Sequence, residues 1–407
     1  MITRIEIENF KSLQKVDLAL GNLNLFVGTN ASGKSNFFDA LRFLQGVGYG
    51  FTIDEILNGK PKSAGSEVWQ AIRGGSARVG FASRQATDGV QDPVVAFTVH
   101  MTIAGRKYRY SIGIAPGNGS VRNESLSVDE KSIFDSSQVT NESGSPVLTV
   151  RYYPGQRGRQ PHLDFQKSRP VLHQLIGHDD CVKTHREQIS NFIMAMSNTQ
   201  RIDPSPAILR EYSQAQAVKR MGERGENFAA LVKTIVGDPK DHEAYVSWLK
   251  QLTPVELDDV SVLAGALSEP LFAIREAGVD RPAPILSDGT LRFAAIAAAF
   301  FQKDMPDILT IEEIENGIHP SRLRLLVELL RSQSTTGDRQ IMATTHSPIV
   351  LAWLESEDYR HTFFCKRDEQ TGASVITALD QIPNFMDLVK KHPIGDLFAE
   401  GWLEGAL

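Results

Sequence analysis

Residues 28–35 read Gly-Thr-Asn-Ala-Ser-Gly-Lys-Ser, which is the pattern G-x-x-x-x-G-K-S. An apolar run, Leu23 to Val27, comes before it, and the sequence from Asn36 to Leu44 has a helical composition. A strand, a glycine-rich loop and a helix in this order form a phosphate-binding loop. The loop therefore constrains the local fold, and it indicates that the ligand is a nucleoside triphosphate with Mg²⁺.

Each part of this loop has a physical reason to contact phosphate. Gly28 and Gly33 let the backbone curl so that its N–H groups point inward, and the helix N-terminus adds a partial positive charge. Lys34 can reach the β- and γ-phosphates, and the Ser35 hydroxyl can ligate Mg²⁺. The residues expected to contact the nucleotide are Asn30, Ala31, Ser32, Gly33, Lys34, Ser35 and Asn36.

The composition of the 407 residues, 41% hydrophobic and 23% charged, is typical of a globular protein with room for two structural units. The sequence has no apolar run of about 18 residues, so no membrane-spanning helix is expected. The first ten residues alternate like an edge strand and lack the layout of a signal peptide. We therefore expect a cytoplasmic location, with Cys181 and Cys365 as free thiols.

The net charge of −6 gives no overall argument for nucleic-acid binding. One local stretch, from Arg151 to Arg169, interleaves basic and aromatic side chains. A solvated loop rich in Gly and Pro is the favoured interpretation, and a nucleic-acid contact is the alternative.

The pattern along the chain changes twice. From Ala77 to about Leu148 apolar residues alternate with period two, and 94–103 and 107–114 are expected to form a β-hairpin. From about Pro170 helical spacing dominates, with helices expected at 179–196, 206–221 and 241–252.

From Pro284 onward short apolar strands alternate with helices, which is typical of a largely parallel sheet. The predicted fold class is therefore α/β, with an antiparallel β-lobe and a helical insertion inside one α/β domain. The predicted division is 1–165 for the N-terminal part with the β-lobe, 166–275 for the helical insertion and 276–407 for the C-terminal part.

An acidic element follows one of these strands, at Ile308-Leu309-Thr310-Ile311-Glu312-Glu313. A strand that ends in two carboxylates can place one toward Mg²⁺ and one toward an attacking water. By position Glu312 is the metal-side acid and Glu313 the general base, and an acidic helix start is the alternative.

Two further polar elements flank the acids. Ser287, in Leu286–Arg292, can cap a helix and leave backbone N–H groups for an anion, although an ordinary N-cap would look the same. His346 follows a strand, Ile341 to Thr345, where it could hydrogen-bond a γ-phosphate or a water.

Together these motifs resemble the ABC-type ATPases, in the branch of RecF/SMC-like and OLD-like P-loop ATPases. The ordered set is Walker A at Gly28–Ser35, a signature L-S-x-G-x-x-R at Leu286–Arg292, Walker B at Ile308–Glu313 and a switch histidine at His346. The D-loop position reads E-N-G-x-H-P, a form similar to this branch and unlike transporter subunits.

The resemblance implies an ABC-type head that binds ATP and Mg²⁺, hydrolyses ATP, and forms a homodimer or higher homo-oligomer through its ATP sites. Ser287 and Gly289 would contact the γ-phosphate held by the partner's P-loop. Three departures are present: Ile314 replaces the usual proline, Glu312 replaces the usual aspartate, and the Q-loop glutamine is unassigned. Its candidates are Gln156, Gln160 and Gln166.

The resemblance also implies a role in DNA repair or anti-phage defence. A stand-alone ATPase of this size resembles the ATPase components of two-gene defence systems, so a separate nuclease or toxin is the expected partner, with nucleic acid as a further one. A slowly hydrolysing, ATP-gated scaffold that holds an effector inactive is the alternative. A nuclease with its own Toprim domain is disfavoured, because the last 40 residues or so contain no Asp-x-Asp. A transporter subunit is disfavoured by the β-lobe and the helical insertion.

Overall fold

The structure is a computed structural model, and it describes residues 1–61, 67–82, 94–137, 139, 145–155, 160–252, 257–336 and 339–406. The chain forms two compact units, each built from several segments. The first unit comprises Met1–Gly21, Gly28–Thr199 and Phe363–Leu379, and the second comprises Asn22–Val27, Gln200–Thr362 and Asp380–Leu407.

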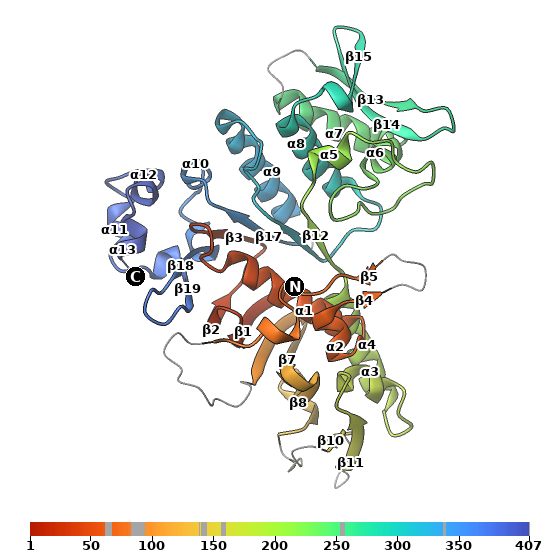
Figure 1. The fold of residues 1–407 in the computed structure, drawn as a ribbon, viewed down its shortest axis with the longest axis vertical. Helices are drawn as coiled ribbons and strands as arrows, with labels where there is room; N and C mark the ends of the chain where they lie inside the picture. Colours follow the sequence, from red (N-terminus) through yellow and green to blue (C-terminus); the bar gives the residue numbers. More distant parts are fainter. Residues whose placement is uncertain are drawn as a thin grey trace. The chain divides into compact units, whose positions relative to one another are not determined.

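The first unit is built on an eight-stranded antiparallel sheet in the order β11-β10-β9-β8-β7-β6-β1-β2 (Figure 1). Side chains alternate between buried and exposed along these strands, which is the pattern of a sheet with one face in the core. The expected hairpin is confirmed as β6 and β7. The strands are β1 Ile2–Phe10, β2 Leu13–Ala19, β6 Val95–Ile103, β7 Arg106–Ala115, β8 Ser120–Val128, β9 Lys131–Asp135, β10 Val147–Tyr152 and β11 His162–Gln166.

Helix α1, Lys34–Gly48, lies on this sheet and also packs against α4. The rings of Phe43 on α1 and Phe97 on β6 stack with centroids 4.6 Å apart. The other helices of the unit are α2 Ile53–Asn58, α3 Val171–Ile176 and α4 Lys183–Ser197. Two short antiparallel pairs complete it, β4 Lys60–Pro61 with β5 Glu67–Trp69, and β18 Thr362–Arg367 with β19 Ser374–Ala378.

The second unit contains the parallel strands of the fold. Strands β3 Leu23–Val27, β17 Gln340–Thr345 and β16 Ile308–Ile311 pair in parallel, and β12 Thr199–Ile202 follows β16 in the sheet order. Side chains of β16 and β17 are buried on both faces, as expected of parallel strands covered by helices. The carboxyl ends of these strands lie at one edge, and Gly28, Glu312 and His346 come directly after β3, β16 and β17.

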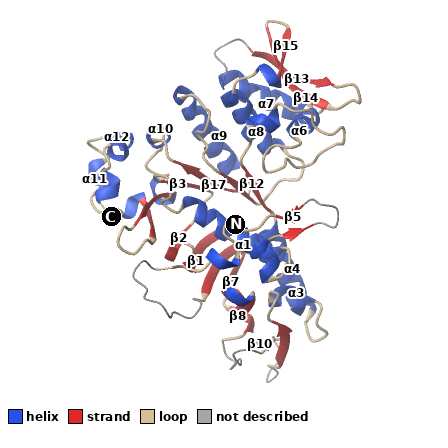
Figure 2. Cartoon of the chain, in the orientation of Figure 1, coloured by secondary structure: helices blue, strands red, loops and turns tan. Residues whose placement is uncertain are grey.

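Helices and a small antiparallel sheet complete the second unit (Figure 2). Helix α6 packs against β13 and β14, and α8 contacts α5, α6 and α7. The strands are β13 Leu257–Ala264, β14 Pro270–Glu276 and β15 Val279–Pro282. The helices are α5 Pro206–Leu209, α6 Phe228–Val236, α7 Pro239–Leu252, α8 Asp288–Ala298, α9 Leu323–Thr336, α10 Pro348–Leu351, α11 Phe385–Leu388, α12 Ile394–Ala399 and α13 Trp402–Gly405. No helix in the described part of the chain is long and apolar enough to cross a bilayer.

The helix expected at 206–221 is wrong, because only α5 forms there. After Leu209 the backbone N–H of Ser213 donates to the Pro270 carbonyl of β14, and Met221 N–H donates to the buried Gln302 side chain. These tertiary hydrogen bonds replace the helical ones that the local spacing favours.

Residues 166–275 are helical only in part, since β12, β13 and most of β14 lie among the expected helices. The division into three parts at 165 and 275 stays a prediction. The expected helix 179–196 begins later, at Lys183.

The basic stretch from Arg151 to Arg169 is not a solvated loop throughout its described residues. It contributes to the pair β10 and β11, where Tyr152 and Phe165 are buried. These two rings therefore pack inside the strand pair and are not open to a nucleic acid. Arg157 and Arg159 lie outside the described residues.

Candidate functional site

The P-loop ends where α1 begins. Gly33 is the N-cap of α1 with φ of +108°, and its carbonyl accepts hydrogen bonds from the N–H groups of Asn36 and Phe37. A β-carbon at Gly33 would come within 2.1 Å of Ser374 Oγ on β19. Both the backbone angle and the close contact therefore require glycine at this position.

Lys34 is buried, with 7% of its surface exposed, and its ammonium group lies over the loop itself. Its Nζ donates to the carbonyl oxygens of Gly28 at 2.6 Å and Thr29 at 2.9 Å. The cation is thus held on the inner side of the loop that the sequence assigns to phosphate. Ser32 is also buried there, and Ala31 adopts a left-handed φ of +64°.

A polar network supports the loop from outside. Ser12 Oγ lies 2.6 Å from Ser374 Oγ and accepts a hydrogen bond from the Asn36 amide at 2.7 Å. Asn36 was expected to contact the nucleotide, and its side-chain amide lies against Ser12. The buried Lys11 ammonium pairs with Asp39 of α1, and burial lowers the pKa of Lys11.

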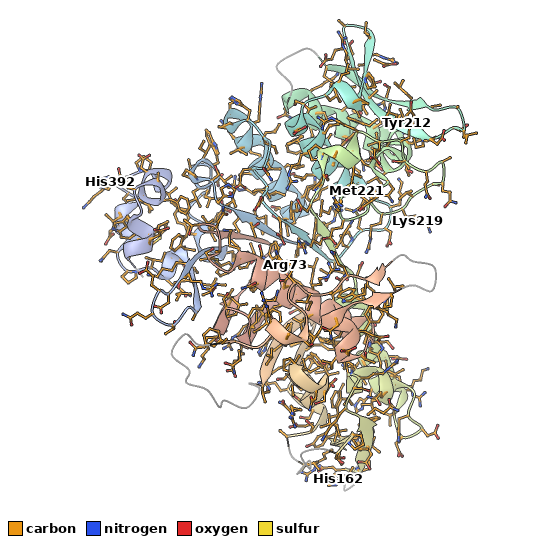
Figure 3. The ribbon with its side chains drawn as sticks, viewed as in Figure 1. Arg73, His162, Tyr212, Lys219, Met221 and His392 are labelled. Carbon is orange, nitrogen blue, oxygen red and sulfur yellow. The ribbon has the colours of Figure 1, made fainter. Side chains whose placement is uncertain are left out.

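Arg73 ties the start of α1 to the segment that follows β5. Arg73 is labelled in Figure 3. Its Nη2 donates to the Ser35 carbonyl at 3.1 Å, and its Nε lies 3.2 Å from Asp39 Oδ2. Sequence reasoning missed Arg73, because it lies 38 residues after Ser35 and outside every motif.

In the second unit, Glu313 follows β16 in a strained conformation. Its φ is +46°, a left-handed value that is unfavourable for a glutamate. The Thr344 hydroxyl on β17 accepts from Glu313 N–H at 2.9 Å, and the Thr344 carbonyl accepts from Ile314 N–H at 3.1 Å. The Asn316 amide donates to Glu313 Oε2 at 3.2 Å. The structure therefore fixes the backbone that aims this carboxylate.

Glu312, the expected metal-side acid, is buried with 9% of its surface exposed. Its Oε1 lies 3.0 Å from Arg201 Nη2 of β12. Arg201 was not predicted, since nothing in the local sequence relates β12 to β16. A carboxylate is a hard oxygen ligand of the kind that Mg²⁺ prefers.

Arg292, the last residue of the L-S-x-G-x-x-R motif, connects this motif to both acids. It is 4% exposed, and its Nη2 donates to the carbonyls of Glu312 at 2.8 Å and Glu313 at 3.2 Å. Its Nη1 donates to Asp203 Oδ1 and to the Pro204 carbonyl. The arginine therefore fixes the end of β16 relative to α8.

Ser287 caps α8, as the sequence predicted, and its Oγ accepts from Thr290 N–H at 3.2 Å. Beside it lies a cavity of about 600 Å³, which we call the signature pocket. A β-carbon at Gly289 would come within 2.2 Å of the Gly317 carbonyl, so the D-loop lies directly against the start of α8. The pocket is lined by Ser287, Gly289, Thr290, Gly317, Ile318, His319, Ser321 and Arg322, all from the second unit.

His346 follows β17, and 45% of its side chain is exposed. Its Nδ1 lies 2.9 Å from Glu315 Oε1, and the same oxygen accepts from His346 N–H at 2.6 Å. Sequence reasoning quoted Glu315 within the D-loop motif but gave it no role.

The Q-loop glutamine stays unassigned. Gln156 lies outside the described residues. Gln166 ends β11, where its backbone bonds the Gln174 side chain.

Two segments of the chain match known protein families. Residues 1–77, with the P-loop, match the family described as "AAA ATPase domain". Residues 244–352, with the signature, the acids and His346, match the family described as "AAA domain, putative AbiEii toxin, Type IV TA system". The chain is 21% identical over 394 residues to an "ATP/GTP phosphatase" of Helicobacter pylori, which covers 91% of this chain and 94% of that relative.

A solved SMC head structure shares the fold. The SMC head bound to the C-terminal winged-helix domain of ScpA aligns with a TM-score of 0.52 and 13% identity, over 93% of this chain and 98% of that one. The chain is a P-loop ATPase with the fold of an SMC head domain. The SMC head domain from Thermotoga maritima also aligns, with a TM-score of 0.44 and 12% identity over 93% of this chain and 98% of that one.

The residues of this ATPase fit its expected ligands. The P-loop supplies a buried ammonium group and a helix N-terminus, which suit a triphosphate. The Ser35 hydroxyl and the Glu312 carboxylate are oxygen donors of the kind that Mg²⁺ prefers. The two residues belong to different compact units, and each is placed within its own.

Proposed function

We propose that this ATPase works as an ATP-switched dimer, in which each nucleotide is bound by the P-loop of one copy and the signature pocket of the other. ATP would join the two copies, and its hydrolysis would release them. The observation that carries the proposal is the signature pocket, because Ser287, Gly289 and Thr290 at the N-terminus of α8 line it and offer groups that suit an anion.

The chain's own groups have distinct roles in this proposal. Lys34 and the loop N–H groups bind the phosphates, and Mg²⁺, held by Ser35 and Glu312, would neutralise phosphate charge. Glu313 takes the proton of the attacking water, and His346 hydrogen-bonds the water or the γ-phosphate. Ser287 and Gly289 approach the γ-phosphate held by the partner copy.

The family descriptions that match the chain support a proposal for its cellular role. We propose a role in anti-phage defence or DNA repair, with a separate nuclease or toxin as the effector. One matching family description names a toxin of a toxin–antitoxin system, which supports the defence role. A cytoplasmic location and contact with nucleic acid belong to the same proposal.

A slowly hydrolysing, ATP-gated scaffold is the second candidate. Two contacts favour it: Arg201 occupies an oxygen of Glu312, and Asn316 bonds the carboxylate of Glu313. Both contacts must break before the two carboxylates can act, and this step would slow hydrolysis. Steady-state ATPase assays with and without DNA separate the two candidates, since the scaffold would hydrolyse slowly under both conditions.

Complementation between two inactive variants tests the shared site. Lys34→Ala removes the P-loop cation, and Ser287→Arg fills the signature pocket. Each variant alone should be inactive, and Ser287→Arg should still bind ATP as a single chain. In an equal mixture, roughly a quarter of the parent activity should return, because half of the dimers are mixed and each mixed dimer has one intact site. A mixture as inactive as its components would exclude a site shared between copies.

Glu313→Gln tests the assigned base. The variant should bind ATP and stay dimeric in its presence, with turnover reduced by about 100-fold or more. Sedimentation velocity with ATP and with ADP reports the dimer, and phosphate release reports turnover. Hydrolysis at the parent rate would show that another residue is the base.

A further inference from the structure

Glu315 is a buried carboxylate close in sequence to Glu312 and Glu313. The roles assigned to those two acids do not explain why a third one is buried here. Only 9% of its surface is exposed. Its Oε1 accepts a hydrogen bond from the His346 backbone N–H at 2.6 Å and lies 2.9 Å from the ring Nδ1. One carboxylate oxygen therefore contacts both the main chain and the ring of the switch histidine.

This contact bears on which ring nitrogen carries hydrogen. A carboxylate oxygen accepts, so a hydrogen bond at this distance requires the hydrogen on Nδ1. The geometry therefore favours the Nδ1–H tautomer, which leaves Nε2 for other partners. The ring is open to solvent, with 45% of the side chain exposed.

The second oxygen of Glu315 points to a role beyond packing. Oε2 is buried and makes no hydrogen bond within the described residues. Burying a carboxylate with one oxygen unused costs free energy, and an apolar residue would avoid that cost. A carboxylate at this position is thus explained by what it does to His346.

We propose that Glu315 is a positioning residue that holds His346 in the Nδ1–H form and directs its Nε2 toward the ATP γ-phosphate or the attacking water. The inference rests on the proposed function, since it needs His346 to act in hydrolysis. It adds Glu315 to that reaction as a group that acts through the histidine and does not touch ATP itself.

Kinetics of four variants test this role. Glu315→Ala should lower kcat about as much as His346→Ala, by about 10-fold or more, with the ATP KM within about two-fold of the parent. The double variant should be no worse than either single one, because both substitutions remove the same interaction. Asp259→Ala is the matched control, since it breaks a second carboxylate–histidine pair, 2.7 Å from His242 Nε2, away from the assigned site residues. It should keep the parent kcat.

Histidine ¹⁵N spectroscopy supplies a readout that a purely structural role would not produce. The His346 signal, assigned by its loss in His346→Ala, should report a protonated Nδ1 in the parent near pH 8. In Glu315→Ala the proton should move to Nε2, the form preferred by free imidazole. A parent protein with hydrogen on Nε2 would overturn the inference whatever the kinetics show. This measurement on the parent still tests the inference if Glu315→Ala fails to fold.

The kinetic outcomes separate this inference from the proposed function. A normal kcat in Glu315→Ala with a slow His346→Ala would overturn the positioning role alone. A normal kcat in His346→Ala would overturn the proposed role of the histidine in hydrolysis. Loss of ATP binding in folded Glu315→Ala would also overturn the inference, since Glu315 would then serve nucleotide binding.

Discussion

Gly289 lies against the carbonyl of Gly317 so closely that an added β-carbon would come within 2.2 Å of the oxygen. The first turn of α8 and the D-loop therefore form one surface, and the signature pocket depends on both. A side chain at Gly289 must displace backbone, because the opposing atom is a carbonyl oxygen.

Gly289→Ala should move the D-loop away from α8 and distort the signature pocket. We expect a loss of about 1–3 kcal/mol in the free energy of unfolding, as for other overpacked sites, and a strong loss of ATPase activity. Urea unfolding and phosphate release measure the two effects. Gly405→Ala is the control, since a β-carbon there meets no atom within 4 Å. Parent-like turnover in Gly289→Ala would mean that the D-loop contact is unimportant for the site.

Thr344→Val should weaken hydrolysis without touching either acid. The Thr344 hydroxyl accepts from Glu313 N–H and holds this residue at its left-handed φ. Its loss leaves that N–H without its acceptor, which costs about 1–3 kcal/mol, and frees the carboxylate to turn away. We expect kcat to fall by about 10-fold. Thr344→Ser keeps the hydroxyl and should keep the activity, so equal rates for Val and Ser would argue against this hydrogen bond.

Arg292→Met should destabilise the protein more than an equivalent change at the surface. The buried guanidinium donates to the carbonyls of Glu312 and Glu313, which the thioether of Met cannot replace. We expect a loss of about 2 kcal/mol or more, measured by urea unfolding. Arg210→Met removes a more exposed arginine that bonds the Leu286 carbonyl and Asp288, and it should cost about 1 kcal/mol or less. A similar loss of unfolding free energy in both variants would contradict a special role for the buried hydrogen bonds of Arg292.

Glu124 predicts a dependence of stability on pH. Its carboxyl is fully buried on β8, accepts from Tyr110 and from the N–H groups of Val171 and Leu172, and burial raises its pKa to about 7. The folded protein thus binds this proton more tightly than the unfolded chain. The stabilisation is complete below pH 4.5 and is lost as the pH rises through 7, by up to about 3 kcal/mol.

Glu124→Gln should remove this slope. Unfolding free energies of the parent and the variant, measured between pH 5 and 8, should differ increasingly in favour of Gln as the pH rises. The test uses the difference between the two stability curves, because other groups also titrate in this range. Burial lowers the pKa of His173 and His185, so these histidines make stability rise with pH in both proteins. A difference that stays constant with pH would show that Glu124 is protonated throughout or not at all.

The parts of the fold that sequence predicted are those with local signals. The P-loop, the strand before Glu312 and the cap at Ser287 depend on neighbouring residues, and the structure contains all three. Helix α2 also had a local signal that went unused, since Thr52 and Glu55 form a reciprocal capping box.

The parts that sequence could not predict depend on contacts between distant segments. Glu315 and His346 are 31 residues apart, and Arg201 pairs with Glu312 across two strands of one sheet. Helical spacing at 206–221 was misleading for the same reason, because hydrogen bonds to β14 and Gln302 outcompete it. Motifs identified the reacting groups, and the residues that aim them came only from the three-dimensional arrangement.

The hydrogen bond between Ser12 and Ser374 spans 362 residues and lies directly behind Gly33. During synthesis the ribosome releases the P-loop well before its support from β19. At about 5–20 residues per second, the interval is roughly 20 to 70 s. A growing chain therefore carries the loop long before it has the surface that shapes it, and competence to bind ATP should arise late and abruptly. Nascent chains that end before Ser374 should therefore not bind ATP.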